Sequence, residues 1–96
     1  MACQVLLEAT IKEGCHDKLK ARFVEVIPDT RNYDGCIYIY FTKDQDDPSK
    51  IIIIELWESS QHYDKYLAWR TERGDMGILE EMMEEPSWRF LDNWGV

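Results

Sequence analysis

The run of nine residues from Ile51 to Ser59 constrains the fold of this chain more than any other stretch. Side chains alternate along a strand, so this run, as a strand, is apolar on both faces. One face carries Ile51, Ile53 and Trp57, and the other carries Ile52, Ile54 and Leu56. A chain of 96 residues usually covers only one such face with its own helices. The second face therefore predicts a partner.

Length and charge limit the class of protein. Ninety-six residues, 45% apolar and 31% charged, predict a single globular domain over residues 1–96. The net charge of −8 argues against nucleic acid and anionic membranes as partners, because phosphates attract Lys and Arg. No apolar run approaches the roughly 20 residues that span a bilayer, and the first residues lack a signal-peptide pattern. We therefore expect a cytoplasmic protein.

The sequence carries few signs of cofactor or metal chemistry. Cys3, Cys15 and Cys36 are an odd set without a CxxC pair, which predicts three reduced thiols. No glycine-rich nucleotide fingerprint is present, and no group of three or four metal ligands has usable spacing. We expect neither a metal nor a cofactor.

Periodicity predicts the first half of the fold. Alternation indicates a strand over residues 3–11, and a turn at 12–14 leads to a helix. The helix has apolar residues on one face, namely Leu19, Phe23, Val26 and Ile27. Pro28 is expected to end or kink it, and residues 32–35 form a loop.

A hairpin follows. Residues 36–42 alternate as a second strand that is apolar on both faces, with Ile37, Ile39 and Phe41 opposite Cys36, Tyr38 and Tyr40. Turn formers at 44–49 join it antiparallel to the strand that begins at Ile51. The register of the hairpin, which this pattern leaves open, determines the face that Tyr38 and Tyr40 occupy.

The last third predicts a broken helix and a fourth strand. Ser59 or Ser60 caps a helix whose inner face carries Tyr63, Tyr66, Leu67 and Arg70. After an interruption at Gly74 and Asp75, a second helical segment carries Ile78, Leu79, Met82 and Met83, and Pro86 ends it. Residues 88–94 alternate again as a strand.

The element order βαββαβ predicts an α+β, ferredoxin-like fold with a four-stranded antiparallel sheet and both helices on one face. Ile52, Ile54 and Leu56 on the other face predict a homodimer that packs sheet against sheet. The alternative is a monomer in which the segment after Gly74 covers that face.

A pattern around the hairpin resembles that of a known family. It comprises Ile27, Pro28, Thr30 and Arg31, then Gly35, Cys36 and Ile37, then Asp44, Asp47 and Pro48, and finally Glu55, Trp57, Glu58 and Ser59. The chain thereby resembles the antibiotic biosynthesis monooxygenase (ABM) family over nearly its whole length. The resemblance implies a dimeric α+β barrel.

The resemblance implies several functions. Family members include cofactor-independent monooxygenases acting on phenolic or quinol substrates, haem-degrading enzymes, an isomerase-like enzyme and proteins of unknown reaction. It also implies a pocket between sheet and helices that is lined by Trp57 and Tyr63. The chain departs from the family pattern in two places. Ile53 replaces an Asn of the tailoring monooxygenases, and Tyr66 and Met76 occupy the positions at which the haem-degrading members have Trp and His. Haem binding is therefore the least favoured function.

Glu55 is the strongest candidate for a catalytic group, because it shares the face of Ile53 and Trp57. Burial would raise its pKa towards neutrality, and a carboxylate so tuned could take a phenolic or enolic proton. The resulting carbanion could then react with O2. The alternative is a structural ion pair with Arg70, Arg73 or Arg89.

Five further residues complete the candidate site. Tyr63 could donate its hydroxyl, while Trp57, Trp69, His62 and the replaced position Ile53 would bind a small aromatic ligand. Core packing is the alternative for the tryptophans, and simple solvation for His62. We therefore expect a cofactor-independent monooxygenase acting on a small aromatic or quinol-like molecule, with a non-catalytic dimeric binding module as the alternative.

Overall fold

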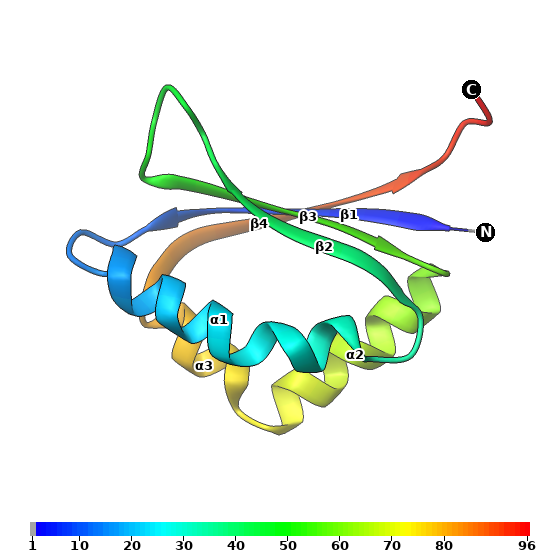
Figure 1. Cartoon of the computed structure of the whole chain (residues 1–96), viewed down its shortest axis with the longest axis horizontal. Coiled ribbons are helices and arrows are strands. Elements are labelled where there is room, and N and C mark those ends of the chain that lie inside the picture. The colour runs from blue at the N-terminus through cyan, green and yellow to red at the C-terminus, as the bar shows by residue number, and fades with distance from the viewer. Residues whose placement is uncertain (1) are drawn as a thin grey trace.

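The computed structural model describes residues 2–96. Its elements are β1 (Cys3–Ile11), α1 (His16–Arg31), β2 (Cys36–Lys43), β3 (Lys50–Trp57), α2 (Ser60–Glu72), α3 (Asp75–Glu80) and β4 (Met83–Asp92). The strands form one antiparallel sheet in the order β2-β3-β1-β4. All three helices lie on one face of it (Figure 1). The predicted α+β, ferredoxin-like fold is confirmed.

Strand β3 alternates in burial as the sequence predicts. Ile51, Ile53, Glu55 and Trp57 are buried beneath the helices, whereas the residues between them are half-buried. Their neighbours come from β1, where Val5, Leu7 and Ala9 point to the same side. Leu19 and Phe23 on α1 close this core from the helix side. The core therefore lies between the helices and the two central strands.

The other face of the sheet has no cover from residues 2–96. Ile52, Ile54 and Leu56 are half-buried there, and Tyr38 and Tyr40 join them because they pair with Leu56 and Ile54. Tyr40 is 58% exposed. Helix α3 lies on the same side as α1 and α2, so the segment after Gly74 does not cover this face (Figure 1).

A bulge in β2 corrects one prediction. Cys36 pairs with Trp57 and Tyr38 with Leu56, so Ile37 is the extra residue on the β2 side. Cys36 consequently packs against the core instead of sharing a face with Tyr38. Alternation alone cannot reveal an inserted residue.

Both prolines that should end helices have other roles. Helix α1 continues through Pro28 to Arg31, and Val24, whose carbonyl Pro28 cannot bond, is exposed. Pro86 lies inside β4, and β4 begins at Met83, where a helix was predicted. Strand β4 is at the edge of the sheet, and its register with β1 shifts near Pro86. A strand accepts proline at such places, because the missing N–H breaks no ladder hydrogen bond there.

None of the helices in residues 2–96 has the length and apolar character needed to cross a bilayer.

Candidate functional site

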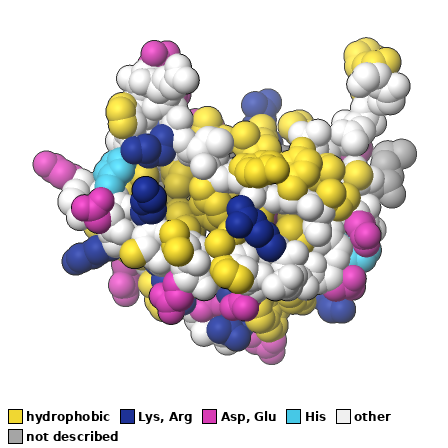
Figure 2. Space-filling model, in the orientation of Figure 1, with side chains coloured by type: hydrophobic (Ala, Val, Ile, Leu, Met, Phe, Trp, Pro, Cys, Tyr) yellow, Lys and Arg dark blue, Asp and Glu magenta, His cyan; other side chains and the backbone are white. Residues whose placement is uncertain are grey.

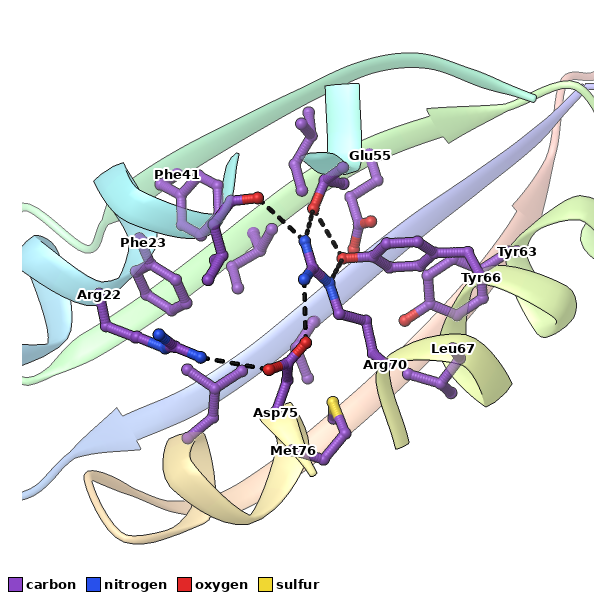
Figure 3. Close-up of a pocket in the computed structure, with 16 residues that line it drawn as sticks. Arg22, Phe23, Phe41, Glu55, Tyr63, Tyr66, Leu67, Arg70, Asp75 and Met76 are labelled. Atoms are coloured by element: carbon purple, nitrogen blue, oxygen red, sulfur yellow. Dashed lines mark hydrogen bonds and ion pairs between the residues drawn. The ribbon is translucent and has the colours of Figure 1, made fainter. Parts of the chain in front are cut away.

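A cavity of about 60 Å³ lies between the sheet and the helices (Figure 3). Strand β3 contributes Ile53 and Glu55 to its wall, and α2 contributes Tyr63, Tyr66 and Arg70. The remaining wall includes Phe23 and Thr30 from α1, Phe41 from β2, and Asp75, Met76 and Leu79 from α3. The family resemblance implies a pocket in this space.

Glu55 is one of two buried carboxylates in the wall of this cavity, with 3% of its surface exposed; the other is Asp75. Burial raises its pKa from about 4.5 to about 7, because a low-dielectric environment disfavours the charged form. A hydrogen bond of 3.1 Å from the indole Nε1 of Trp57 acts in the opposite direction, since it stabilises the carboxylate. Glu55 therefore exchanges its proton near neutral pH.

The ion pair considered as the alternative for Glu55 is not formed by the residues described. Arg70 and Arg73 both bind Asp75, at 2.9 and 3.2 Å. Arg89 lies on β4 opposite Leu6, whose side of the sheet faces away from the helices. Glu55 thus depends on a neutral donor, the indole of Trp57, rather than on a cation.

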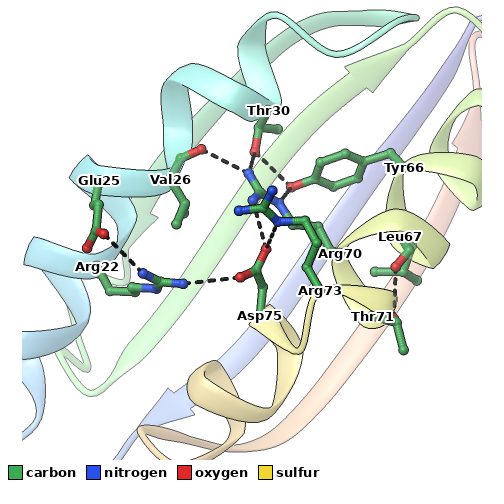
Figure 4. Close-up of polar contacts among 10 residues, drawn as sticks. All are labelled: Arg22, Glu25, Val26, Thr30, Tyr66, Leu67, Arg70, Thr71, Arg73 and Asp75. Atoms are coloured by element: carbon green, nitrogen blue, oxygen red, sulfur yellow. Dashed lines mark hydrogen bonds and ion pairs between the residues drawn. The ribbon is translucent and has the colours of Figure 1, made fainter.

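Arg70 is the best-bonded side chain around the cavity and is 4% exposed (Figure 4). Its Nη1 donates to Asp75, its Nη2 to the carbonyl of Val26 and the hydroxyl of Thr30, and its Nε to the hydroxyl of Tyr66. These bonds join α1, α2 and α3 at one point. The network fixes the helices that cover the cavity.

Asp75 is shared among three arginines. Arg22 binds its Oδ1 at 3.2 Å, while Arg70 and Arg73 bind its Oδ2. Burial alone would raise the pKa of Asp75, but the hydrogen bonds and charges of Arg70 and Arg73 outweigh it and lower the pKa below its ordinary value. The carboxylate stays ionised and anchors the first turn of α3.

Tyr63 is 2% exposed, and its hydroxyl accepts a 3.0 Å hydrogen bond from the indole of Trp88. Burial first, and the nearby charge of Glu55 second, raise its pKa above the ordinary range, so the phenol stays protonated. Within residues 2–96, Trp88 is its one hydrogen-bond partner. The hydroxyl proton of Tyr63 is therefore available to an oxygen placed in the cavity.

The predicted site residues divide into two groups. Glu55, Tyr63 and Ile53 line the cavity together. Trp57 lies behind Glu55 with no exposed surface, and Trp69 stacks on Arg70 and Arg73, with guanidinium carbons 4.7 and 4.9 Å from its ring centroid. Neither indole is part of the cavity wall.

His62 lies outside the cavity, at the start of α2. Its Nδ1 is 2.6 Å from the hydroxyl of the N-cap Ser59, and its Nε2 is 3.6 Å from Glu58 and 4.0 Å from Asp34. Asp34, Glu58 and His62 lie close enough together to hold a metal ion. Their spacing in the sequence did not predict this group. Both carboxylates are exposed.

The network around Arg70 was not predicted as part of the site. The available signal was Arg70 itself, a charged residue on the apolar face of α2, which requires an anion when buried. Its partner Asp75 comes from the following helix, whereas Thr30 lies forty positions away in the sequence. Local spacing does not identify such partners.

A sequence model of the family described as antibiotic biosynthesis monooxygenase matches residues 4–71 of the chain. A comparison with curated proteins finds no match.

Solved structures share the fold. A conserved protein from Methanosarcina mazei Go1 is 16% identical, with a TM-score of 0.88 over 97% of this chain and 93% of its own. Protein SO0527 from Shewanella oneidensis is 22% identical, with a TM-score of 0.81 over 94% and 88%. A mutant of SnoaB, a cofactor-independent oxygenase from Streptomyces nogalater, is 10% identical, with a TM-score of 0.85 over 99% and 95%. At these identities the likeness concerns the fold alone.

Proposed function

The chain belongs to the antibiotic biosynthesis monooxygenase family, and from this premise we propose that it is a cofactor-independent monooxygenase that oxidises a small aromatic, quinol-like or anthrone-like molecule. The observation that carries the proposal is Glu55, a buried carboxylate that pairs with no cation among residues 2–96 and whose pKa of about 7 suits a general base near neutral pH. Tyr63 supplies a protonated hydroxyl in the same cavity.

The proposed reaction begins with proton transfer. Glu55 takes a proton from a phenolic hydroxyl or an activated ring methylene, while the hydroxyl of Tyr63 donates a hydrogen bond to the adjacent oxygen, where negative charge develops. The electron-rich anion then passes one electron to O2, and the two radicals combine into a peroxide anion. Protonated Glu55 returns the proton to that peroxide. Glu55 then takes the remaining proton from the carbon that carries the peroxide; the C–H electron pair forms the carbonyl, the O–O bond breaks, and the departing hydroxide takes that proton and leaves as water.

Substrate entry requires movement. The cavity of about 60 Å³ has room for about two water molecules, whereas ligand pockets usually measure roughly 300 to 1,000 Å³. The ion pairs of Asp75 hold the first turn of α3, so the side chains of Met76 and Leu79 are the parts of the wall best suited to move. Met76 is the more adaptable of the two, because its unbranched side chain has three rotatable bonds.

The test is oxygen consumption with a panel of hydroquinones and anthrones. We expect turnover by the native protein, and a drop in kcat of at least about a hundredfold in Glu55→Gln, because general-base catalysis contributes that much. Glu58→Gln is the matched control, since Glu58 is an exposed carboxylate three residues along the chain. Tyr63→Phe should lower kcat more than it raises KM. No oxygen uptake with any substrate, or equal rates in Glu55→Gln, contradicts the proposal.

A non-catalytic binding module of the same fold is the second candidate. The observation that favours it is Ile53, a buried apolar side chain in the cavity wall. A small molecule retained by the purified protein, without turnover in air, would support this function. Haem has the least support, because Tyr66 and Met76 lie in the cavity wall at the positions where haem-degrading members of the family have Trp and His.

We further propose that two copies pack through the bare face of the sheet. Ile52, Ile54 and Leu56 form its centre, between Tyr38 and Tyr40 on β2 and Leu6 on β1. Complete burial of one such aliphatic side chain is worth about 1.5 to 3 kcal/mol. Exposure of such a face to water is therefore unfavourable, and a symmetric dimer would bury this face on both copies.

A further inference from the structure

A second depression lies on the outside of the molecule, between α1 and the edge strand β2. Its volume is about 580 Å³, which falls in the range of small-molecule sites and is far above that of the cavity around Glu55. On the side where α1 and β2 face the viewer, Figure 2 shows basic and His side chains around an apolar surface. We name this depression the α1–β2 groove.

The charge of the groove is opposite to that of the chain. Lys20, Arg31 and Lys43 line it, together with His16, and Asp17 is the one acidic residue among them. The groove thus has three of the chain's eleven Lys and Arg residues but only one of its nineteen Asp and Glu residues. In a protein of net charge −8, this concentration of positive charge attracts anions to one place.

Apolar side chains form the rest of the groove. Phe23 and Ile51 are buried beneath it, whereas Val24 on α1 is 66% exposed. The Nη2 of Arg31 donates a 3.3 Å hydrogen bond to the carbonyl of Ile39 on β2, which directs the guanidinium towards the sheet side of the groove. A cation beside an apolar surface suits a ligand that has one charged end and one apolar end.

The groove is separate from the cavity around Glu55. Phe23 and Phe41 line both spaces, and their ring centroids are 4.3 Å apart. This aromatic pair forms a wall between them. A ligand in the groove therefore does not contact Glu55.

We propose that the α1–β2 groove binds a small amphipathic anion, such as a carboxylate on an aliphatic or aromatic body. The basic residues hold the anionic group, and the apolar body lies against Val24, Ile27 and Phe41. The proposal does not depend on the oxidation reaction, because it concerns residues other than Glu55 and Tyr63. An acidic peptide paired with the free edge of β2 would fill the same place, and the experiment distinguishes the two.

The experiment is a titration of the full-length, isotope-labelled protein with octanoate, followed by amide chemical shifts. We expect the shifts to concentrate on Lys20, Val24 and Lys43, and 1-octanol, which has the same body without the charge, to bind at least about fivefold more weakly. The double substitution Lys20→Gln with Lys43→Gln should weaken octanoate binding by about fivefold or more. Lys18→Gln removes an exposed charge from the same helix outside the groove and should leave affinity unchanged.

A second variant tests the apolar surface. Val24→Asp replaces an exposed side chain, so the fold should be retained, and it should abolish octanoate binding by adding a negative charge at the groove. Three results would overturn the proposal: equal affinity for octanoate and 1-octanol, unchanged affinity in the double variant, or shifts confined to Ile52, Ile54 and Leu56. Binding of an acidic peptide without binding of octanoate would also overturn the proposal, because the groove would then be a peptide site.

Discussion

The indole Nε1 of Trp57 donates a 3.1 Å hydrogen bond to the carboxylate of Glu55, two residues earlier on the same face of β3. The period of a strand brings these two side chains together, and the helices bury both. Burial raises the pKa of Glu55, while the indole lowers it by stabilising the charged form. The proton affinity of the candidate base is therefore set by the helices that bury it and by an indole two residues along the same strand.

Trp57→Phe should raise the pKa of Glu55 above about 7, because the desolvating environment remains while the donor is lost. The measurement is an NMR titration of the side-chain carboxyl carbon. Trp69→Phe is the control, since that indole stacks on Arg70 and Arg73 and should leave the pKa of Glu55 unchanged. Removing part of a fully buried ring should also lower the free energy of unfolding by about 2 kcal/mol. An unchanged or lower pKa in Trp57→Phe contradicts this account.

Glu55→Gln should stabilise the protein at alkaline pH. The folded-state pKa of Glu55 is raised from about 4.5 to about 7, so its contribution to stability is complete below about pH 4.5 and is lost as pH rises through 7. Above pH 7 the buried charge costs up to about 3 kcal/mol, and Gln avoids this cost. Urea unfolding at constant protein concentration should show similar stabilities at pH 4.5 and a more stable variant at pH 8. A difference independent of pH, or one shared by Glu58→Gln, would contradict the prediction.

Features that depend on local periodicity could be predicted from the sequence. Strand β3 is the clearest case, because alternation assigns Ile53 and Glu55 to one face and Ile54 to the other before any partner strand is known. The burial of Glu55 follows from that assignment. Whether a cation would neutralise it could not be predicted, because the partners of Arg70 depend on how three helices meet.

Features that depend on pairing between distant strands were predicted less well. The bulge at Ile37 reverses the face of Cys36, and it becomes visible only when β2 is aligned with β3. Pro86 indicated the end of a helix, yet it lies in β4, where the edge of the sheet leaves its missing N–H without consequence. In both cases the deciding interaction is with a strand remote in sequence.

Asp75→Asn should lower the free energy of unfolding by about 3 kcal/mol, because it leaves the guanidinium of Arg70, 4% exposed, without a counter-charge. Amide exchange in α3 should accelerate, since Asp75 anchors that helix to α1 and α2. Glu80→Gln, at an exposed position of the same helix, should change stability by less than about 0.5 kcal/mol. The pKa of Asp75 is lowered, so its contribution should be present near neutral pH and be lost as pH falls through that pKa. Equal effects of the two substitutions contradict this role.

Ile54→Asp should convert the proposed dimer into a monomer. The residue lies at the centre of the bare sheet face, between Leu6 on β1 and Tyr40 on β2, where an unpaired carboxylate would oppose close packing. Light scattering should then report a mass near 11.4 kDa instead of twice that value. Val24→Asp adds the same charge on the helix side of the molecule and should leave the dimer intact. A monomeric native protein at micromolar concentration, or a dimeric Ile54→Asp variant, excludes this interface.

Gly35→Ala should destabilise the protein more than Gly14→Ala, although both glycines have positive φ, +90° and +79°. A Cβ at position 35 would lie 2.4 Å from Cδ2 of His62, whereas a Cβ at position 14 meets no atom within 4 Å. Gly14→Ala therefore measures the backbone cost alone, about 1 kcal/mol. The excess in Gly35→Ala measures how closely the loop packs against the start of α2, because Cβ of His62 lies about as near as its ring and cannot turn away. Urea unfolding gives both values, and the resonances of His62 should move only in Gly35→Ala. Equal costs at the two positions would contradict this close packing.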